Sequence, residues 1–95
     1  LKKIVIDLFI LYLMFVYLTD LENDIQMIFL ETFQDMTKDE FSLDKKQEDY
    51  DSWDSFAHLN LITMTESKFD ITISIDETTS ITSARDLLDC VNSHL

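Results

Sequence analysis

The chain has 95 residues, enough for one small domain whose core comes from a few elements. Asp and Glu number 19 against 7 Lys and Arg, and the net charge of −12 disfavours nucleic acid and anionic membranes as partners and favours basic protein faces. The single cysteine, Cys90, excludes an intramolecular disulfide, and no Cys/His spacing is read as a metal site, so we expect a reduced, cytoplasmic protein. Glycine and proline are absent, which favours helices joined by Asp, Ser and Thr loops.

The first 18 residues differ from the rest: Ile4 to Leu18 is almost continuously apolar, interrupted by Asp7, and Lys2 and Lys3 come before it. The run is shorter than the roughly 20 apolar residues that span a bilayer, and no small-residue cleavage site follows it. A start site placed too early is one interpretation, because Met14 lies inside the run. The other is a hydrophobic helix that docks on the domain, a partner or a membrane. We therefore divide the chain into an extension, 1–19, and a domain, 20–95.

The first helix of the domain is predicted over residues 21–36, with Thr19 and Asp20 suited to cap it. Its apolar residues recur at steps of three and four, as on one face of an amphipathic helix: Leu21, Ile25, Ile28, Phe29, Phe33 and Met36. Residues 37–53 are polar apart from a few apolar anchors. They predict a long ordered loop that can hold a short turn of helix.

The second helix is predicted over residues 54–69. Asp54 is suited to cap it and to lie at the positive end of its dipole. This assignment places Ser55 in the first turn with its hydroxyl at the surface, beside backbone N–H groups that favour an anion. One side of the helix carries the apolar residues expected to face the core: Phe56, Leu59, Ile62 and Phe69.

The remaining residues predict a loop and two more helices. Residues 70–75 alternate polar and apolar, but the sequence offers no partner strand, so an extended loop is expected. A short third helix is expected over 76–80. The last helix opens with Thr82 or Ser83 as its cap and ends near Ser93, and Ser83 with Asp86 resembles a capping box at its start. The fold class is therefore all-α, a small four-helix bundle with a long first loop and a short third helix.

Three further patterns suggest chemistry but are better explained by structure. His58 lies three residues after Ser55, yet no third group orients a Ser–His dyad, so a surface histidine is the better interpretation. The Asp-rich stretch 49–54 lacks the glycine and glutamate of a calcium loop. Cys90 is expected to be a small, half-buried residue rather than a reactive thiol. No metal site and no catalytic residue is predicted.

Residues 20–95 resemble an acyl carrier protein in the order of their elements and in several short motifs. The residues that carry the resemblance are Asp54-Ser55-Phe56, the apolar series Phe56, Leu59, Leu61 and Ile62, the helix end Glu66-x-x-Phe69, and Ile81-Thr82-Ser83 before the last helix. Each motif is weakly specific alone, whereas their joint order and spacing is fairly specific. The resemblance implies a bundle of the acyl-carrier type.

The resemblance also implies that Ser55 receives a 4′-phosphopantetheine arm from coenzyme A, with Asp54 beside it at the helix N-terminus. The arm would hold acyl or aminoacyl groups as thioesters for a specialised biosynthetic pathway, and the chain itself would not be an enzyme. Expected partners are a phosphopantetheinyl transferase, a loading ligase, and a downstream synthase or transferase with a basic docking face. The residues expected to contact them are Phe56, His58 and Glu66, and the chain is expected to be a monomer.

An acyl pocket inside the bundle is a further implication of the resemblance. Its expected lining is apolar: Phe56, Leu59, Ile62, Ile73, Ile75, Ile81 and Leu87. Thr63 and Thr65 stand where larger apolar side chains are common in the family. We therefore expect a small or polar pocket that prefers short, polar or aminoacyl cargo.

Alternatives to this interpretation stay open. Asp51-Ser52-Trp53 also reads as acid, serine and apolar residue, so Ser52 is a second candidate for attachment, at a less fitting distance from Phe69. A different function, an unmodified acidic helical adaptor that binds a protein partner, is separated from a carrier by the effect of Ser55→Ala. Membrane attachment would depend entirely on residues 1–18.

Overall fold

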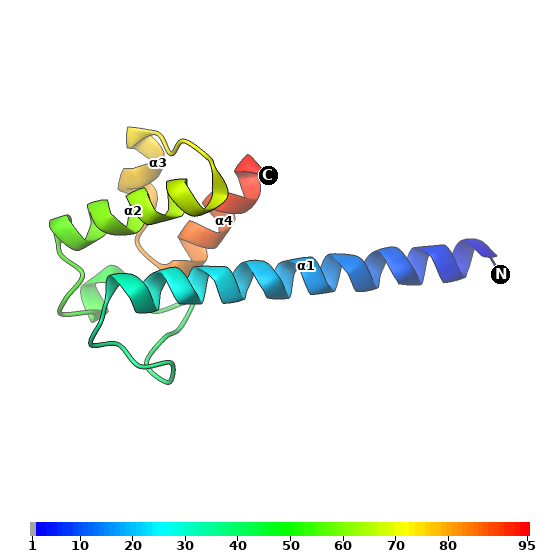
Figure 1. The fold of residues 1–95 in the computed structure, drawn as a ribbon, viewed down its shortest axis with the longest axis horizontal. Helices are drawn as coiled ribbons and strands as arrows, with labels where there is room; N and C mark the ends of the chain where they lie inside the picture. Colours follow the sequence, from blue (N-terminus) through cyan, green and yellow to red (C-terminus); the bar gives the residue numbers. More distant parts are fainter. Residues whose placement is uncertain (1) are drawn as a thin grey trace.

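The computed structural model describes residues 2–95, which form four α-helices and one short 3-10 helix (Figure 1). In chain order these are α1 (Lys2–Thr32), η1 (Gln47–Asp49), α2 (Ser55–Phe69), α3 (Ile75–Ser80) and α4 (Ala84–His94). Over these residues no strand forms, and one antiparallel bridge joins Lys46 to Ser83. The predicted all-α class, the long first loop and the short third helix are confirmed.

Helix α1 is continuous, so the predicted extension and first domain helix are one element. Thr19, expected to cap a new helix, lies inside α1 and donates its hydroxyl to the Phe15 carbonyl oxygen at 2.9 Å. The helix continues because the stretch has no glycine or proline to break it, and its many Leu, Met and Ile residues are compatible with helix. It ends at Thr32, before the predicted end at Met36.

The first half of α1 projects away from the other helices (Figure 1). From residue 7 to residue 20 the side chains are exposed, apart from the half-buried Val16, although most are apolar. Residues 7–20 therefore do not pack on the domain in this structure, and docking on a partner or a membrane stays a prediction. Burial begins at Leu21, which is 3% exposed. Among residues 2–95, no helix combines the length and the apolar character needed to cross a membrane.

The core lies where the second half of α1 packs against α2 and α4. The long loop adds Tyr50 and Trp53. Between ring centroids, Trp53 lies 5.4 Å from Phe29 and 5.7 Å from Phe33 of α1, and Tyr50 lies 6.0 Å from Phe33. The largest fully buried side chains are Phe29, Ile25, Leu61, Ile81, Leu87, Val91 and Thr65. Because Trp53 comes just before α2, this aromatic group fixes the N-terminus of α2 to the core.

The loop between α1 and α2 is also held on the start of α4. The Arg85 backbone N–H donates to the Leu43 carbonyl oxygen at 2.9 Å, and the Gln47 N–H donates to the Thr82 carbonyl oxygen at 2.7 Å. The Arg85 guanidinium Nε bonds the Asp44 carboxylate at 2.6 Å. These contacts join the loop, η1 and α4 into one unit.

The Asp44 to Arg85 pair makes stability depend on pH. The hydrogen bond from Arg85 holds the pKa of the Asp44 carboxyl below its usual value of 3.8. A lowered pKa stabilises the folded chain above the unfolded-state pKa, and this contribution is lost as the pH falls through the folded-state pKa. We expect Asp44→Asn to lower the melting temperature only slightly at neutral pH, because an exposed ion pair contributes little. At a pH where Asp44 is protonated, the substitution should not change the melting temperature.

Melting curves of wild type, Asp44→Asn and the control Asp39→Asn, an exposed carboxylate in the same loop, check this expectation. The difference in melting temperature between wild type and Asp44→Asn should disappear as the pH falls below about 3.8. A gap that stays constant with pH, or widens in acid, contradicts the assignment.

Asp70, the C-cap residue that follows α2, is a non-glycine residue in the left-handed region, with φ 53° and ψ 51°. Its backbone N–H donates to the Glu66 carbonyl oxygen, as in a helix C-cap where glycine is common. Aspartate tolerates this conformation better than β-branched residues do. The chain thus closes a helix without glycine.

Replacing Asp70 with valine is expected to lower the free energy of unfolding by about 1 kcal/mol, because a β-branched residue is strained in the left-handed region. Asp70→Gly should be at least as stable as wild type. Urea denaturation followed by the fluorescence of Trp53 measures both, with Thr72→Val at an exposed position as the control. Equal stability of the valine and glycine variants would remove the conformational explanation.

Candidate functional site

Ser55 is the first residue of α2, and its side chain is exposed. Asp54 caps the helix as predicted: its backbone is extended, and its Oδ1 accepts the Ala57 N–H at 2.8 Å. Trp53, one residue earlier, is 4% exposed and packs in the core. The Ser55 hydroxyl therefore lies at the N-terminus of α2, which the buried Trp53 holds on the core. The helix dipole there favours an anion.

Ser52, the second candidate, is also exposed but lies in the turn before α2. Its backbone is outside the helix, so it does not share the position of Ser55 at the helix N-terminus. The setting of the two serines therefore differs, and the electrostatic environment favours Ser55 for an anionic modification.

His58 is a bridging residue rather than the free surface histidine that we expected. Its Nδ1 accepts the Trp53 Nε1–H at 3.0 Å, and its Nε2 lies 2.8 Å from the Thr78 carbonyl oxygen of α3. The imidazole also stacks on the Trp53 ring, with centroids 5.9 Å apart. Because an indole N–H can only donate, Nδ1 accepts and Nε2 carries the proton that reaches Thr78.

This arrangement leaves His58 without a free nitrogen for the Ser55 hydroxyl. A general base must have a lone pair within hydrogen-bond reach of the proton that it removes. The Nδ1 lone pair of His58 is occupied by Trp53, and its Nε2 proton by Thr78. A Ser–His dyad is therefore not formed in this structure.

Glu66, predicted to contact partners, makes an internal contact. Its Oε2 accepts the Ile73 N–H at 2.9 Å, which holds the loop between α2 and α3 against the end of α2. The side chain is half-buried. In this structure Glu66 therefore stabilises the loop between α2 and α3.

The predicted acyl-pocket residues divide into two groups. Four lie in the packed core, each at most 7% exposed: Ile62, Ile73, Ile81 and Leu87. Three lie on the surface, and their predicted interior placement is wrong: Phe56 at 74%, Leu59 at 61% and Ile75 at 85% exposed. The four buried residues are brought together in one core cluster.

The misplacement on α2 has a geometric cause. Residues three apart are offset by about 60° around a helix, so a series built from steps of three drifts off any one face. The buried face of α2 is instead formed by Leu61, Ile62 and Thr65. Thr65 donates its hydroxyl to the Leu61 carbonyl oxygen at 2.7 Å, so the polar group that we expected to line a pocket is satisfied within the helix. Thr63 is exposed.

A cavity of about 620 Å³, open to solvent, lies between η1, the segment that leads into α2, and the residues just before α4. Its lining mixes aromatic and polar side chains: Lys46, Gln47, Glu48, Tyr50, Trp53 and Thr82. The Tyr50 hydroxyl is buried without a hydrogen-bond partner among the described residues, and burial raises its pKa. Trp53 thus contacts both this cavity and His58, a role that its position before the Asp-Ser pair did not indicate.

Two comparisons with known proteins find no match for this chain. No protein-family model matches it, and no curated protein matches it with significance. The site is therefore interpreted from its own geometry.

Proposed function

We propose that the chain is a carrier protein of the acyl-carrier type, which holds acyl or aminoacyl groups as thioesters on a 4′-phosphopantetheine arm attached to Ser55. The observation that carries the proposal is the exposed Ser55 at the first position of α2, directly after the capping Asp54, within an all-α bundle. The short α3 and the amphipathic α4 that follow agree with the order of elements that the resemblance implies.

The local chemistry supports a modified serine and not a catalytic one. The α2 N-terminus is favourable for the phosphodiester that would join the arm to Ser55. His58 has no free lone pair to activate the hydroxyl, so a separate transferase must supply the base and the coenzyme A. The domain then acts by tethering, which raises the effective concentration of cargo at each partner enzyme.

The exposed apolar residues near the site support a docking role. Phe56 and Leu59 follow Ser55 on α2, and Ile75 opens α3, which is joined to the first turn of α2 by the bond from His58 to Thr78. Exposed apolar side chains beside the modified serine are available to contact the apolar centre of a partner's interface. With a net charge of −12, the partner face is expected to be apolar at its centre and basic at its rim.

The cavity beside Trp53 is a better candidate for cargo than the packed core. Its lining includes Lys46, Gln47 and Glu48, which suit a polar or aminoacyl group better than a long alkyl chain. This agrees with the expectation of short or polar cargo. The predicted core pocket would have to open first, since its four buried residues are close-packed.

Intact-mass spectrometry tests the proposal. Wild type, Ser55→Ala and Ser52→Ala are incubated with coenzyme A, magnesium and a broad-specificity phosphopantetheinyl transferase. We expect one phosphopantetheine addition to wild type and to Ser52→Ala and none to Ser55→Ala. Circular dichroism verifies that each variant is folded. An unmodified but folded wild type, across more than one transferase, contradicts the carrier function.

The adaptor alternative is favoured by one observation, the exposed apolar first half of α1. A helix that is apolar around its whole circumference is normally buried by something. An adaptor would keep its partner in the Ser55→Ala variant, whereas a carrier would lose all cargo. Pull-down of a partner from the source cell with both proteins distinguishes the two functions.

A further inference from the structure

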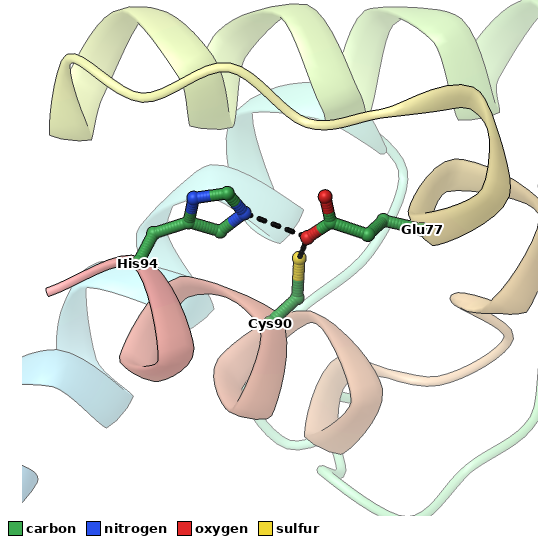
Figure 2. Close-up of side chains that lie close together, drawn as sticks. All are labelled: Glu77, Cys90 and His94. Atoms are coloured by element: carbon green, nitrogen blue, oxygen red, sulfur yellow. Dashed lines mark hydrogen bonds and ion pairs between the residues drawn. The ribbon is translucent and has the colours of Figure 1, made fainter.

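Three side chains of different chemistry meet between α3 and α4, as Figure 2 shows. The Cys90 thiol donates to Glu77 Oε2 at 3.2 Å, and His94 Nε2 lies 2.6 Å from the same oxygen. The sulfur, the nitrogen and the carboxylate oxygen all lie within 4.8 Å of one another. None of the three residues belongs to the site around Ser55.

Each member of this cluster is positioned by its helix. Cys90 and His94 are four residues apart on α4 and therefore lie on the same face of that helix. Glu77 comes from α3, where Ser74 and Glu77 form a capping box. The Ser74 N–H donates to Glu77 Oε1 at 3.2 Å, which leaves Oε2 directed at the thiol and the imidazole. An outer hydrogen bond that orients a ligand oxygen in this way is typical of metal sites.

We propose that Glu77, Cys90 and His94 bind a divalent metal ion of the zinc class. Thiolate, imidazole and carboxylate are the donors that zinc takes in proteins. Metal-to-donor distances of about 2.0–2.3 Å place the donor atoms of a tetrahedral site about 3–4 Å apart, so small side-chain movements would close the cluster around an ion. The thiolate and the imidazole favour zinc over magnesium or calcium.

The fourth coordination position has access to solvent. A groove of about 410 Å³ runs beside the cluster and is lined in part by Glu77, Cys90 and Ser93. Asp86 and Asp89 line the same groove, and their charges attract a cation. With three protein ligands, water is expected to complete the tetrahedron.

Charge and protons balance in the binding step. Hydrogen bonds from His94, Cys90 and Ser74 lower the pKa of Glu77 to about 2, so this carboxylate is ionised at neutral pH. Burial and the Glu77 carboxylate raise the pKa of the Cys90 thiol to about 12, so the thiol is protonated before metal arrives. On binding, the metal to sulfur bond forms and the thiol proton leaves to solvent. The proton that His94 Nε2 donates to Glu77 also leaves that nitrogen, so that the imidazole binds the metal as its neutral form protonated at Nδ1. One thiolate and one carboxylate then neutralise the two positive charges.

Titration of the untagged full chain with Co²⁺ tests the site, because thiolate bound to Co²⁺ gives a charge-transfer absorption in the near ultraviolet. Cys90 is the only cysteine, so this band reports one residue. We expect a band at a stoichiometry of one metal per monomer, displaced by Zn²⁺, and a Zn²⁺-dependent rise in melting temperature. No band from the folded wild type, or a band that appears only in a dimer bridged by two cysteines, overturns the proposal.

Variants separate a built site from a thiol that binds metal alone. Cys90→Ser should abolish the band, and Glu77→Gln, which keeps an oxygen for the Ser74 N–H, and His94→Asn should each weaken Co²⁺ binding by at least about 10-fold. Asp76→Asn, which removes an exposed acid of α3 that does not line the groove, is the matched control and should change affinity little. Unchanged affinity in both Glu77→Gln and His94→Asn overturns the proposal. None of these results depends on modification of Ser55.

Discussion

Replacing Trp53 with alanine is expected to lower the free energy of unfolding by about 3–5 kcal/mol, the range for deleting a large buried aromatic side chain. The indole is 4% exposed and contacts the rings of Phe29, Phe33 and Tyr50. Its loss would open a cavity and release the chain before Ser55 from the core. Since small domains are stable by roughly 5–15 kcal/mol, this single change removes a large part of the total.

Urea denaturation followed by far-ultraviolet circular dichroism measures the effect, because the variant has lost the only tryptophan. Trp53→Phe is the matched variant: it keeps an aromatic ring in the core but has no N–H for His58. We expect it to be destabilised by less than Trp53→Ala. An alanine variant within about 1 kcal/mol of wild type contradicts the anchoring role.

His58→Ala is expected to lower the free energy of unfolding by about 2–3 kcal/mol, because it leaves the buried Trp53 donor without an acceptor and removes the bond to Thr78. The second loss detaches α3 from α2, so hydrogen exchange of α3 amides should rise as well. Asn60→Ala, at an exposed position of the same helix, is the control.

A double-mutant cycle isolates the bond between the two side chains. Trp53→Phe removes the donor, so adding His58→Ala should then cost less than it does in wild type. Full additivity of the two changes would mean that the Trp53 to His58 bond does not contribute, and that His58 acts through Thr78 alone.

The helix starts could be predicted because their signals are local. Asp54 caps α2 and Ser83 caps α4, as the sequence indicates. The predicted capping box requires the Asp86 carboxylate to accept the Ser83 N–H. It accepts the Thr82 N–H instead, at 3.1 Å. A complete capping box instead forms at Ser74 and Glu77, at the start of a helix too short to show periodicity.

The length of α1 could not be predicted from capping preferences. Thr19 and Asp20 are good caps in isolation, but either residue is also tolerated inside a helix when apolar helix-forming residues flank it on both sides. The cap signal competes with helix continuation, and no glycine or proline forces a break. The boundary between the projecting half of α1 and the domain is therefore marked by side-chain burial, which begins at Leu21. The backbone conformation does not change there.

The candidate sites differ in how far the sequence reveals them. Ser55 and Asp54 are adjacent in sequence, so one motif locates both. The role of His58 depends on the Thr78 carbonyl oxygen, twenty positions away, which no sequence pattern links to it. Cys90 and His94 have the spacing of a helical ligand pair, which is visible in the sequence, whereas Glu77 joins them only through the packing of α3 on α4.

Site mapping of the modified wild-type chain tests the central claim most directly. After incubation with coenzyme A, magnesium and transferase, the protein is digested and the phosphopantetheine-bearing peptide is fragmented in a tandem mass spectrometer. The account predicts the entire modification on Ser55, with Ser52 in the same peptide unmodified. Modification at Ser52 would move the attachment site into the turn before α2, and a folded chain that stays unmodified would contradict the carrier function itself.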